Sequence, residues 1–398
     1  MCEREKSVKK SGIFFIVLCC IMMCSCSTEI DFSDLLDGFF NEEVSYKEPS
    51  KIDVSDYYTT SYDSPVEREL SESEIEIYNL ICYYIENGKL EFIFQDRDED
   101  EIIKAYLEVM NDHPEYFWLN KGYRYTKRTF STYSEVEFTP VSHGTEMVIA
   151  SKRDKFNEVV DNIVSEAETK ESLYDKVLYV HDYIVDNTSY DHEAAEDYDE
   201  DDIYFDSRTA YGCLVNGKAV CSGYAYAFQC VMQKLGIPCG YITGTDIKRG
   251  ESHAWNYLTL GDYNYQIDVT WDDSGYLSDD GETTERKSYD YFLVTTDEME
   301  LTHIIDRDQN VPECNGLEYN YYIYNNLYFP EYEFEYVAYT IRENVSNGSV
   351  SVKFGAAEEC LKAVDDLITN NRIFRIDGVN DHVTYIQGNN GLTLTFTF

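Results

Sequence analysis

Apolar side chains recur at helical spacing in two segments that open the folded part of the chain. The first of these expected helices begins at Ser71, and the second begins at about Asp98. The stretches around Tyr123 and Val136 then alternate between apolar and polar residues, which predicts β-strands. We therefore expect residues 67–145 to form a small N-terminal α+β unit.

The next amphipathic segment has a regular apolar stripe. Its core-facing positions, spaced as on one side of a helix, are Phe156, Val159, Val160, Ile163, Val164 and Ala167. A further helix is expected from Ser172. Beyond residue 250, expected strands over Ala254–Leu260 and Asn264–Val269 flank a Gly261-Asp262 turn, which predicts an antiparallel hairpin. We place these elements in a central domain at residues 146–312.

The chain after residue 330 alternates again between apolar and polar residues. This pattern predicts strands over Tyr332–Ile341, Ser349–Phe354, Thr384–Ile386 and Leu392–Phe398. One amphipathic segment, Ala356–Leu367, predicts a helix among them. We therefore assign residues 313–398 to a C-terminal β-rich domain.

The N-terminus has the design of an export signal. Basic residues precede an unbroken apolar run of 12 residues, Ile13–Cys24, which is shorter than the ~20 residues of a membrane-spanning helix. The run leads into Met23-Cys-Ser-Cys26, which resembles a bacterial lipobox with Cys26 as the lipidated residue. Cys24 is a competing candidate, and an ordinary cleaved signal is the alternative.

These features predict a signal peptide with a lipobox at residues 1–26 and an acidic tether at residues 27–66. A lipid on Cys26 would be the expected membrane contact of the protein. The folded part is then expected on the outer face of a bacterial cytoplasmic membrane.

The charge of the chain is strongly negative. It has 32 Lys and Arg against 76 Asp and Glu, which gives a net charge of −44. A surface this acidic repels phosphate backbones, so nucleic-acid binding through a general basic face is not expected. Solubility is one interpretation of the charge, and attraction of a basic protein or peptide substrate is the other.

Cysteine and histidine spacing gives no support for a metal site. Seven cysteines follow Cys26, so any set of intramolecular disulfides leaves at least one free thiol. That part of the sequence contains no C-x-x-C pair, and it contains no H-E-x-x-H motif. Phosphate-cradling glycine motifs are absent as well. We expect neither a metal nor a cofactor, while calcium dependence and oligomeric state stay open.

Candidate chemistry begins at Cys221, where a loop runs directly into an amphipathic helix that ends near Gly236. A helix start presents free backbone N–H groups and the positive end of the helix dipole, which favour a thiolate. The same N–H groups can stabilise an oxyanion formed on a bound carbonyl. Taken alone, Cys221 fits a buried structural cysteine equally well.

A histidine and an aspartate on the expected hairpin change this balance. His253 lies at the start of the first strand, and Asp268 lies near the end of the second. These two ends are adjacent in an antiparallel hairpin, so the carboxylate can reach and orient the imidazole. A thiol at a helix start with such a His/Asp pair has the parts of a cysteine acyl transferase.

Three motifs in this order resemble the transglutaminase-like superfamily, a branch of the papain-like cysteine enzymes. They are Gly217-Lys-Ala-Val-Cys-Ser-Gly-Tyr-Ala225, Ser252-His-Ala-Trp-Asn256 and Gln266-Ile-Asp-Val-Thr-Trp271. The resemblance covers about residues 151–312. It implies an α+β fold with a papain-like core, in which the helix that carries the nucleophile packs on an antiparallel sheet.

The resemblance also implies roles for individual residues. Carried over position by position, Cys221 is the nucleophile, His253 is the general base and acid, and Asp268 orients His253. The implied reaction is attack on an amide bond of a protein or peptide through a thioester, without a cofactor.

Two questions stay open at this point. The motifs do not settle the second oxyanion donor, for which we consider Tyr211 or Asn216, with Trp255 as a residue that frames the site. Crosslinking by a second amine and hydrolysis by water both fit an extracellular enzyme of this type. The alternative function is that of a non-catalytic surface-binding or scaffolding protein that retains the fold.

Overall fold

The computed structural model describes residues 70–197, 205–273, 287–307, 309–380 and 382–398. The expected signal peptide with Cys26 and the expected tether lie outside these ranges. Within them, no helix combines the length and the apolar character that a membrane crossing needs.

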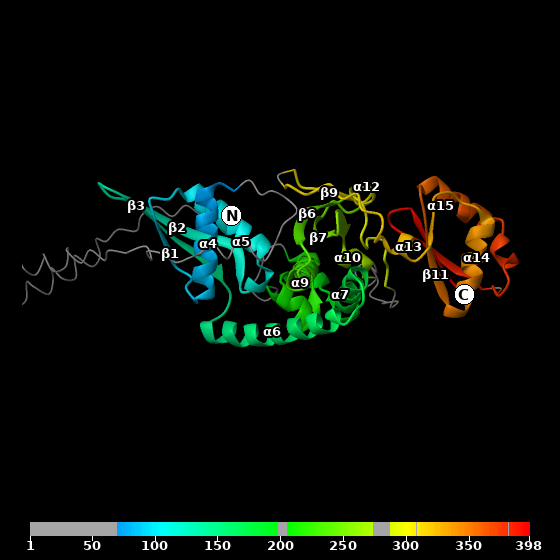
Figure 1. The fold of residues 1–398 in the computed structure, drawn as a ribbon, viewed down its shortest axis with the longest axis horizontal. Coiled ribbons are helices and arrows are strands. Elements are labelled where there is room, and N and C mark those ends of the chain that lie inside the picture. The colour runs from blue at the N-terminus through cyan, green and yellow to red at the C-terminus, as the bar shows by residue number, and fades with distance from the viewer. Residues whose placement is uncertain (1–69, 198–204, 274–286, 308, 381) are drawn as a thin grey trace, which may run out of the picture. The chain divides into compact units, whose positions relative to one another are not determined.

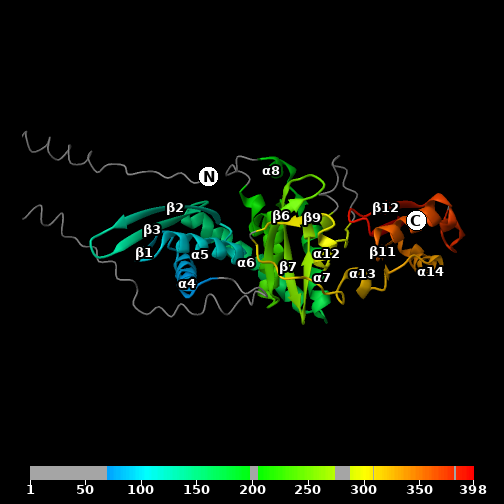
Figure 2. The same cartoon turned by 90° about the horizontal axis from the view of Figure 1, so that it is seen from above.

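The first elements are two helices and a three-stranded antiparallel sheet. The helices are α4 (Glu72–Glu86) and α5 (Glu99–Asp112). The sheet has the order β1-β3-β2, with bounds Phe92–Gln95 for β1, Leu119–Thr129 for β2 and Ser134–Ser142 for β3. Both helices lie on one face of this sheet (Figures 1 and 2). Between the layers, the buried Tyr84 ring stacks on Phe92 of β1 and the buried Tyr106 ring packs edge-on against Phe138 of β3.

Three longer helices open the central part of the chain. They are α6 (Glu146–Glu168), α7 (Leu173–Asn187) and α9 (Cys221–Lys234). Short elements connect α7 to α9, namely β4 (Ser189–Tyr190), α8 (His192–Glu196), a 3-10 turn (Asp206–Arg208), a π-helical turn (Gly212–Asn216) and β5 (Lys218–Ala219). Since β4 and β5 pair in parallel, the connection brings the chain back alongside α7 just before α9 begins.

A four-stranded antiparallel sheet of order β8-β7-β6-β9 follows. Its strands are β6 (Cys239–Asp246), β7 (Ser252–Leu260), β8 (Tyr263–Ile267) and β9 (His303–Ile305). The Asn256 side chain on β7 donates hydrogen bonds of 3.1 Å to the carbonyls of Ala225 on α9 and Gly240 on β6. The predicted α+β core, with the helix of Cys221 packed on an antiparallel sheet, is therefore confirmed.

The predicted hairpin forms, but its second strand is shorter than expected. Asn256 pairs with Ile267, and β8 ends there instead of continuing to Val269. Asp268 is the N-cap of a short helix, α10 (Val269–Asp272), and its Oδ1 accepts the backbone N–H groups of Thr270 and Trp271. An aspartate that satisfies two free amides of a first helical turn stabilises the helix over the strand.

The C-terminal part has a sheet of order β10-β11-β13-β12. The strands are β10 (Tyr328–Phe329), β11 (Ser349–Phe354), β12 (Thr384–Gln387) and β13 (Thr393–Thr397), and the helices are α13 (Tyr321–Tyr324), α14 (Phe334–Asn344) and α15 (Ala357–Val364). The prediction of a strand over Tyr332–Ile341 is wrong, because α14 begins at Phe334 and occupies the rest of this segment. Val337 and Ile341 are buried one helical turn apart, whereas Tyr336 and Tyr339 are exposed.

Candidate active site

Cys221 is the first residue of α9, a helix of 14 residues. Its N-cap, Val220, offers no side-chain hydrogen bond, so no side-chain cap occupies the backbone N–H groups of the first turn. Of the seven cysteines that the structure describes, all unpaired, Cys221 alone is partly exposed and the other six are buried. The helix start therefore presents an accessible thiol beside free amide donors.

Gly223 allows the connection before α9 to pack tightly against the start of this helix. A Cβ atom at this position would lie 2.7 Å from the carbonyl oxygen of Ser207 and 2.8 Å from Cβ of Ala219. Any larger residue would push the first turn of α9 away from that connection. The glycine thus fixes where the Cys221 thiol lies.

His253 and Asp268 meet as the hairpin predicts. The Nε2 atom of His253 lies 2.6 Å from Oδ2 of Asp268, and both side chains are buried. Because β7 and β8 pair with Asn256 opposite Ile267, the first residues of β7 lie beside the chain that leaves β8. Oδ1 of Asp268 is held by the amides of Thr270 and Trp271, at 3.0 and 3.1 Å. The N-cap of α10 therefore aims the second oxygen at His253.

The pair is strongly polarised. Burial alone would lower the pKa of His253, but the charge of Asp268 and the hydrogen bonds of the ring to Asp268 and Cys221 outweigh it and raise this pKa to about 10. Burial likewise opposes ionisation of Asp268, yet His253 and His303 keep its pKa well below the usual range. Because Nε2 of His253 faces Asp268, Nδ1 is the ring nitrogen left for the Cys221 thiol.

His303 is a member of this cluster that the sequence did not reveal. It begins β9, and its Nε2 lies 3.1 Å from the same Oδ2 atom of Asp268. No local motif marks it, because it follows Asp268 by 35 residues and reaches the site only through the pairing of β9 with β6. The signal that could have found it is a His at the start of a short apolar strand, which is common and weak.

The ligand atoms of His253, Asp268 and His303 lie within 4.8 Å of one another, as in a site for a metal ion. Two imidazoles and a carboxylate are donors that first-row transition metals accept. In this geometry, however, Oδ2 of Asp268 lies at hydrogen-bond distance from both imidazoles and Oδ1 accepts two backbone amides. A cation would have to displace the two imidazole protons.

Trp255 frames the two imidazoles. Its ring lies nearly parallel to that of His253, with centroids 5.9 Å apart, and 4.9 Å from that of His303. The indole N–H donates to the side-chain oxygen of Gln266 at 2.7 Å, which fixes the ring. Trp271 lies on another side, 4.6 Å from the His303 ring. The aromatic rings exclude water from the imidazole–carboxylate contacts.

The two residues considered as oxyanion donors make their described contacts elsewhere. The Tyr211 ring stacks on Phe117 with centroids 4.9 Å apart, and the Lys152 ammonium lies over it. The Asn216 amide is exposed and lies 3.4 Å from Asp206. The described contacts of both side chains thus lie in other parts of the fold, whereas no side chain caps the backbone amides of the first turn of α9.

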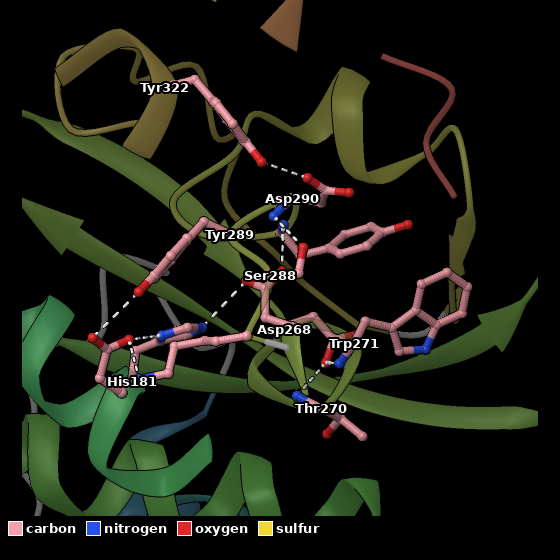
Figure 3. A network of polar contacts seen from close by, with 12 residues as sticks. His181, Asp268, Thr270, Trp271, Ser288, Tyr289, Asp290 and Tyr322 are labelled. Carbon is pink, nitrogen blue, oxygen red and sulfur yellow. Dashed lines mark hydrogen bonds and ion pairs between the residues drawn. The ribbon is translucent and has the colours of Figure 1, made fainter. Parts of the chain in front are cut away.

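A second layer of polar contacts holds α10. Nε2 of His181 on α7 lies 3.3 Å from Oδ2 of Asp272, whose Oδ1 accepts the N–H of Tyr291 at 3.1 Å. Figure 3 shows this network, with the Tyr289 hydroxyl pointing toward the carboxylate of Asp182 beside His181 and the Tyr322 hydroxyl toward Asp290. Burial raises the pKa of Asp272 to about 6. Asp272 therefore anchors the helix that Asp268 caps.

Comparison with known protein families finds a match that covers this site. Residues 157–271 match the family model of the transglutaminase-like superfamily, a range that includes Cys221, His253 and Asp268. His303 lies beyond the matched range. Comparison with the curated proteins finds no match.

Three solved structures are similar to parts of the chain. A TGase crystal structure shares 16% identity over 45% of this chain and 51% of that one, with a TM-score of 0.27. A candidate cysteine protease from Cytophaga hutchinsonii shares 13% identity over 45% of this chain and 64% of that one, with a TM-score of 0.24. A candidate protease from Parabacteroides distasonis shares 11% identity over 39% of this chain and 37% of that one, with a TM-score of 0.23.

The chain thus spans less than two thirds of the length of each of these structures. The family match supports a cysteine-dependent enzyme at the level of the superfamily. The segment that carries Cys221, His253 and Asp268 is thus similar to the transglutaminase-like superfamily over residues 157–271.

Proposed function

We propose that the protein is a cysteine-dependent acyl transferase or hydrolase that acts on amide bonds through a thioester at Cys221. The observation that carries this proposal is the 2.6 Å contact between His253 and Asp268, which leaves Nδ1 of His253 for the thiol at the start of α9. An oriented imidazole beside a partly exposed thiol is the arrangement of an activated nucleophile.

The reaction has two halves. In the first, the Cys221 thiol gives its proton to Nδ1 of His253 and the sulfur attacks the amide carbonyl carbon, so that a C–S bond forms while the carbonyl oxygen becomes an oxyanion. Backbone N–H groups at the start of α9 face that charge, and removing one such donor from an enzyme typically costs about 10²–10³-fold in rate. His253 then gives its Nδ1 proton to the nitrogen, the oxyanion re-forms the C=O bond as the C–N bond breaks, and the amine leaves the thioester.

In the second half, a new amine or a water attacks the thioester. His253 takes a proton from the attacking group, the C–S bond breaks and the sulfur regains its electron pair. A positioned imidazole of this kind contributes about 10²–10⁴-fold to each proton transfer. An amine acceptor gives a crosslink, and water gives hydrolysis.

The test runs two assays on the same protein. Incorporation of dansylcadaverine into casein measures transfer to an amine, and release of ammonia or of new amino termini from the same casein measures hydrolysis. We expect activity in at least one assay and its loss in the Cys221→Ala variant. Activity in neither assay, together with slow labelling of Cys221 by iodoacetamide, contradicts the proposal and favours a non-catalytic binding protein.

We also propose, from the N-terminal sequence, that the protein is exported and anchored through a lipid on Cys26. Metabolic labelling with a palmitate analogue in a bacterial host tests this. Labelling should disappear in Cys26→Ser and persist in Cys24→Ser. Equal labelling of both variants, or of neither, contradicts the assignment.

A further inference from the structure

We propose that His303 is a positioning residue for the reaction, which donates its Nε2–H to Asp268 and so fixes the oxygen that orients His253. This inference rests on the function proposed above. His303 is buried, and its Nε2 lies 3.1 Å from Oδ2 of Asp268, the atom that lies 2.6 Å from Nε2 of His253. One carboxylate oxygen is therefore shared by two imidazoles.

The neighbouring residue, Thr302, holds the ring of His303 in place. An ionised carboxylate only accepts hydrogen bonds, so the proton of His303 must be on Nε2. Its other nitrogen, Nδ1, lies 2.8 Å from Oγ1 of Thr302, and the same hydroxyl lies 3.4 Å from the Met299 carbonyl oxygen, to which it donates. The two ring nitrogens of His303 are therefore both held, Nδ1 by Thr302 and Nε2 by Asp268. Thr302 thus fixes the ring orientation in which Nε2 faces Asp268.

The sheet fixes the place of His303. Strand β6 pairs with β7 through Gly244 opposite His253, and with β9 through Asp246 opposite His303. Because Gly244 and Asp246 are two residues apart, His253 and His303 project from the same face of the sheet. Gly244 leaves the room that the Trp255 ring fills beside them, since a Cβ there would lie 2.5 Å from that ring.

The second imidazole changes how strongly the charge of Asp268 stabilises the His253 imidazolium. Four N–H groups share the charge of this carboxylate, from the amides of Thr270 and Trp271 and from the two imidazoles. If the donor on His303 is removed, Oδ1 stays anchored and more of the negative charge faces His253. The His253 imidazolium then releases its proton less readily, which slows protonation of the leaving amine.

The ionisable groups around this pair come from several elements. Cys221 of α9 and Asp268 before α10 act directly on His253. His303 of β9 acts on Asp268, and the Tyr291 ring packs against His303 with centroids 5.6 Å apart. Asp272 lies one helical turn beyond Asp268, where His181 binds it. Variants at His303 leave all these other groups in place.

The experiment compares His303→Phe with His303→Gln in the full-length chain. Phe keeps a flat ring among the tryptophans and loses the donor, while the Gln amide can donate to Asp268. The rate of Cys221 modification by iodoacetamide is measured against pH, and dansylcadaverine incorporation into casein or release of its products gives kcat. His113→Gln, a buried histidine in the N-terminal α+β elements, is the matched control.

We expect His303→Phe to move the alkaline step of the labelling profile upward by about one pH unit and to lower kcat about tenfold. His303→Gln and the control should keep the alkaline step at its wild-type pH. Thr302→Val should move this step upward, as His303→Phe does. Far-UV circular dichroism shows whether each variant folds. The Gln and Val variants test the proposal even if Phe does not fold.

Two results overturn the proposal in distinguishable ways. In the first, wild-type Cys221 labels rapidly, and His303→Phe keeps the alkaline step of the labelling profile and the kcat of the wild type. An equal loss of kcat in His303→Phe and His303→Gln with an unchanged alkaline step has the same meaning. Either result shows that His303 only packs. The function proposed above then stands. If wild-type Cys221 labels as slowly as the buried thiols, the proposed function fails and this inference fails with it.

Discussion

The described part of the chain holds two contacts of a cysteine with a histidine and a carboxylate, and they differ in where the cysteine lies. At the candidate active site, Cys221 faces His253, which is bound to Asp268. In the N-terminal α+β elements, Sγ of Cys82 lies 3.5 Å from Nε2 of His113, whose Nδ1 lies 2.8 Å from Glu115. Residue types and contacts are nearly the same.

The surroundings separate the two groups. Cys82 lies in the last turns of α4, with a relative exposure of 0%, so its backbone N–H is part of the helix ladder and no substrate can reach its sulfur. Cys221 begins α9 beside uncapped amides and is partly exposed. The comparison teaches that a thiol, an imidazole and a carboxylate in contact become an active site only at a helix start that substrate can reach.

Removing the sulfur of each cysteine in turn should give the largest difference in kcat between the two sites. We expect Cys221→Ala to lower kcat in the casein assays by about 10⁴-fold or more, because the covalent intermediate cannot form. Cys82→Ala should keep kcat within about twofold of the wild type. A large loss of kcat in folded Cys82→Ala would show that the buried group takes part in the chemistry.

Neutralising the carboxylate of each site should give the second largest difference in kcat. Asp268→Asn keeps the shape of the side chain but no longer stabilises the His253 imidazolium, so kcat should fall by about 10³–10⁴-fold. The matched change Glu115→Gln should leave kcat unchanged. Similar effects of the two substitutions, measured in the same assay, would remove the distinction between the sites.

The smallest expected effect is on stability. Burial alone would lower the pKa of His113, but Tyr78, Cys82 and Glu115 outweigh it and raise this pKa well above its usual range. A raised pKa in the folded state gives stability that is complete below about pH 6.5 and is lost as pH rises toward the folded value. His113→Gln should therefore destabilise the protein more at pH 6 than at pH 9.

Urea denaturation at both pH values measures this difference. The destabilisation by His113→Gln should shrink by about 1 kcal/mol per pH unit over the range in which His113 loses its proton only in the unfolded chain. A destabilisation that is independent of pH would mean that His113 is uncharged in the folded protein, and that the buried group is held together by packing alone.

Much of the fold could be predicted because its signals are local. The helix stripe over 156–167 and the hairpin around Gly261 are periodic patterns that tertiary structure had no reason to override. The segment 332–341 failed because its tyrosines look like the apolar positions of a strand. In the structure, Tyr336 and Tyr339 are exposed, and the buried stripe is the helical one of Val337 and Ile341.

The candidate site divides in the same way. The contact of His253 with Asp268 follows from the hairpin and could be predicted from it. His303 could not, because its position depends on the pairing of β6 with a strand that is distant along the sequence. The same holds for Asp272, which is buried because α10 turns it toward His181 on a distant helix. Long-range contacts of this kind leave no local pattern.

Competitive labelling of the native protein by iodoacetamide near neutral pH tests the central claim most directly. Peptide mass spectrometry reads the rate at every cysteine of the described chain in one sample, so Cys82 serves as the internal reference for Cys221. We predict that Cys221 is modified at least about 100-fold faster than Cys82, and that the two rates converge in concentrated urea. Equal, slow labelling of both thiols in the native protein would contradict the account.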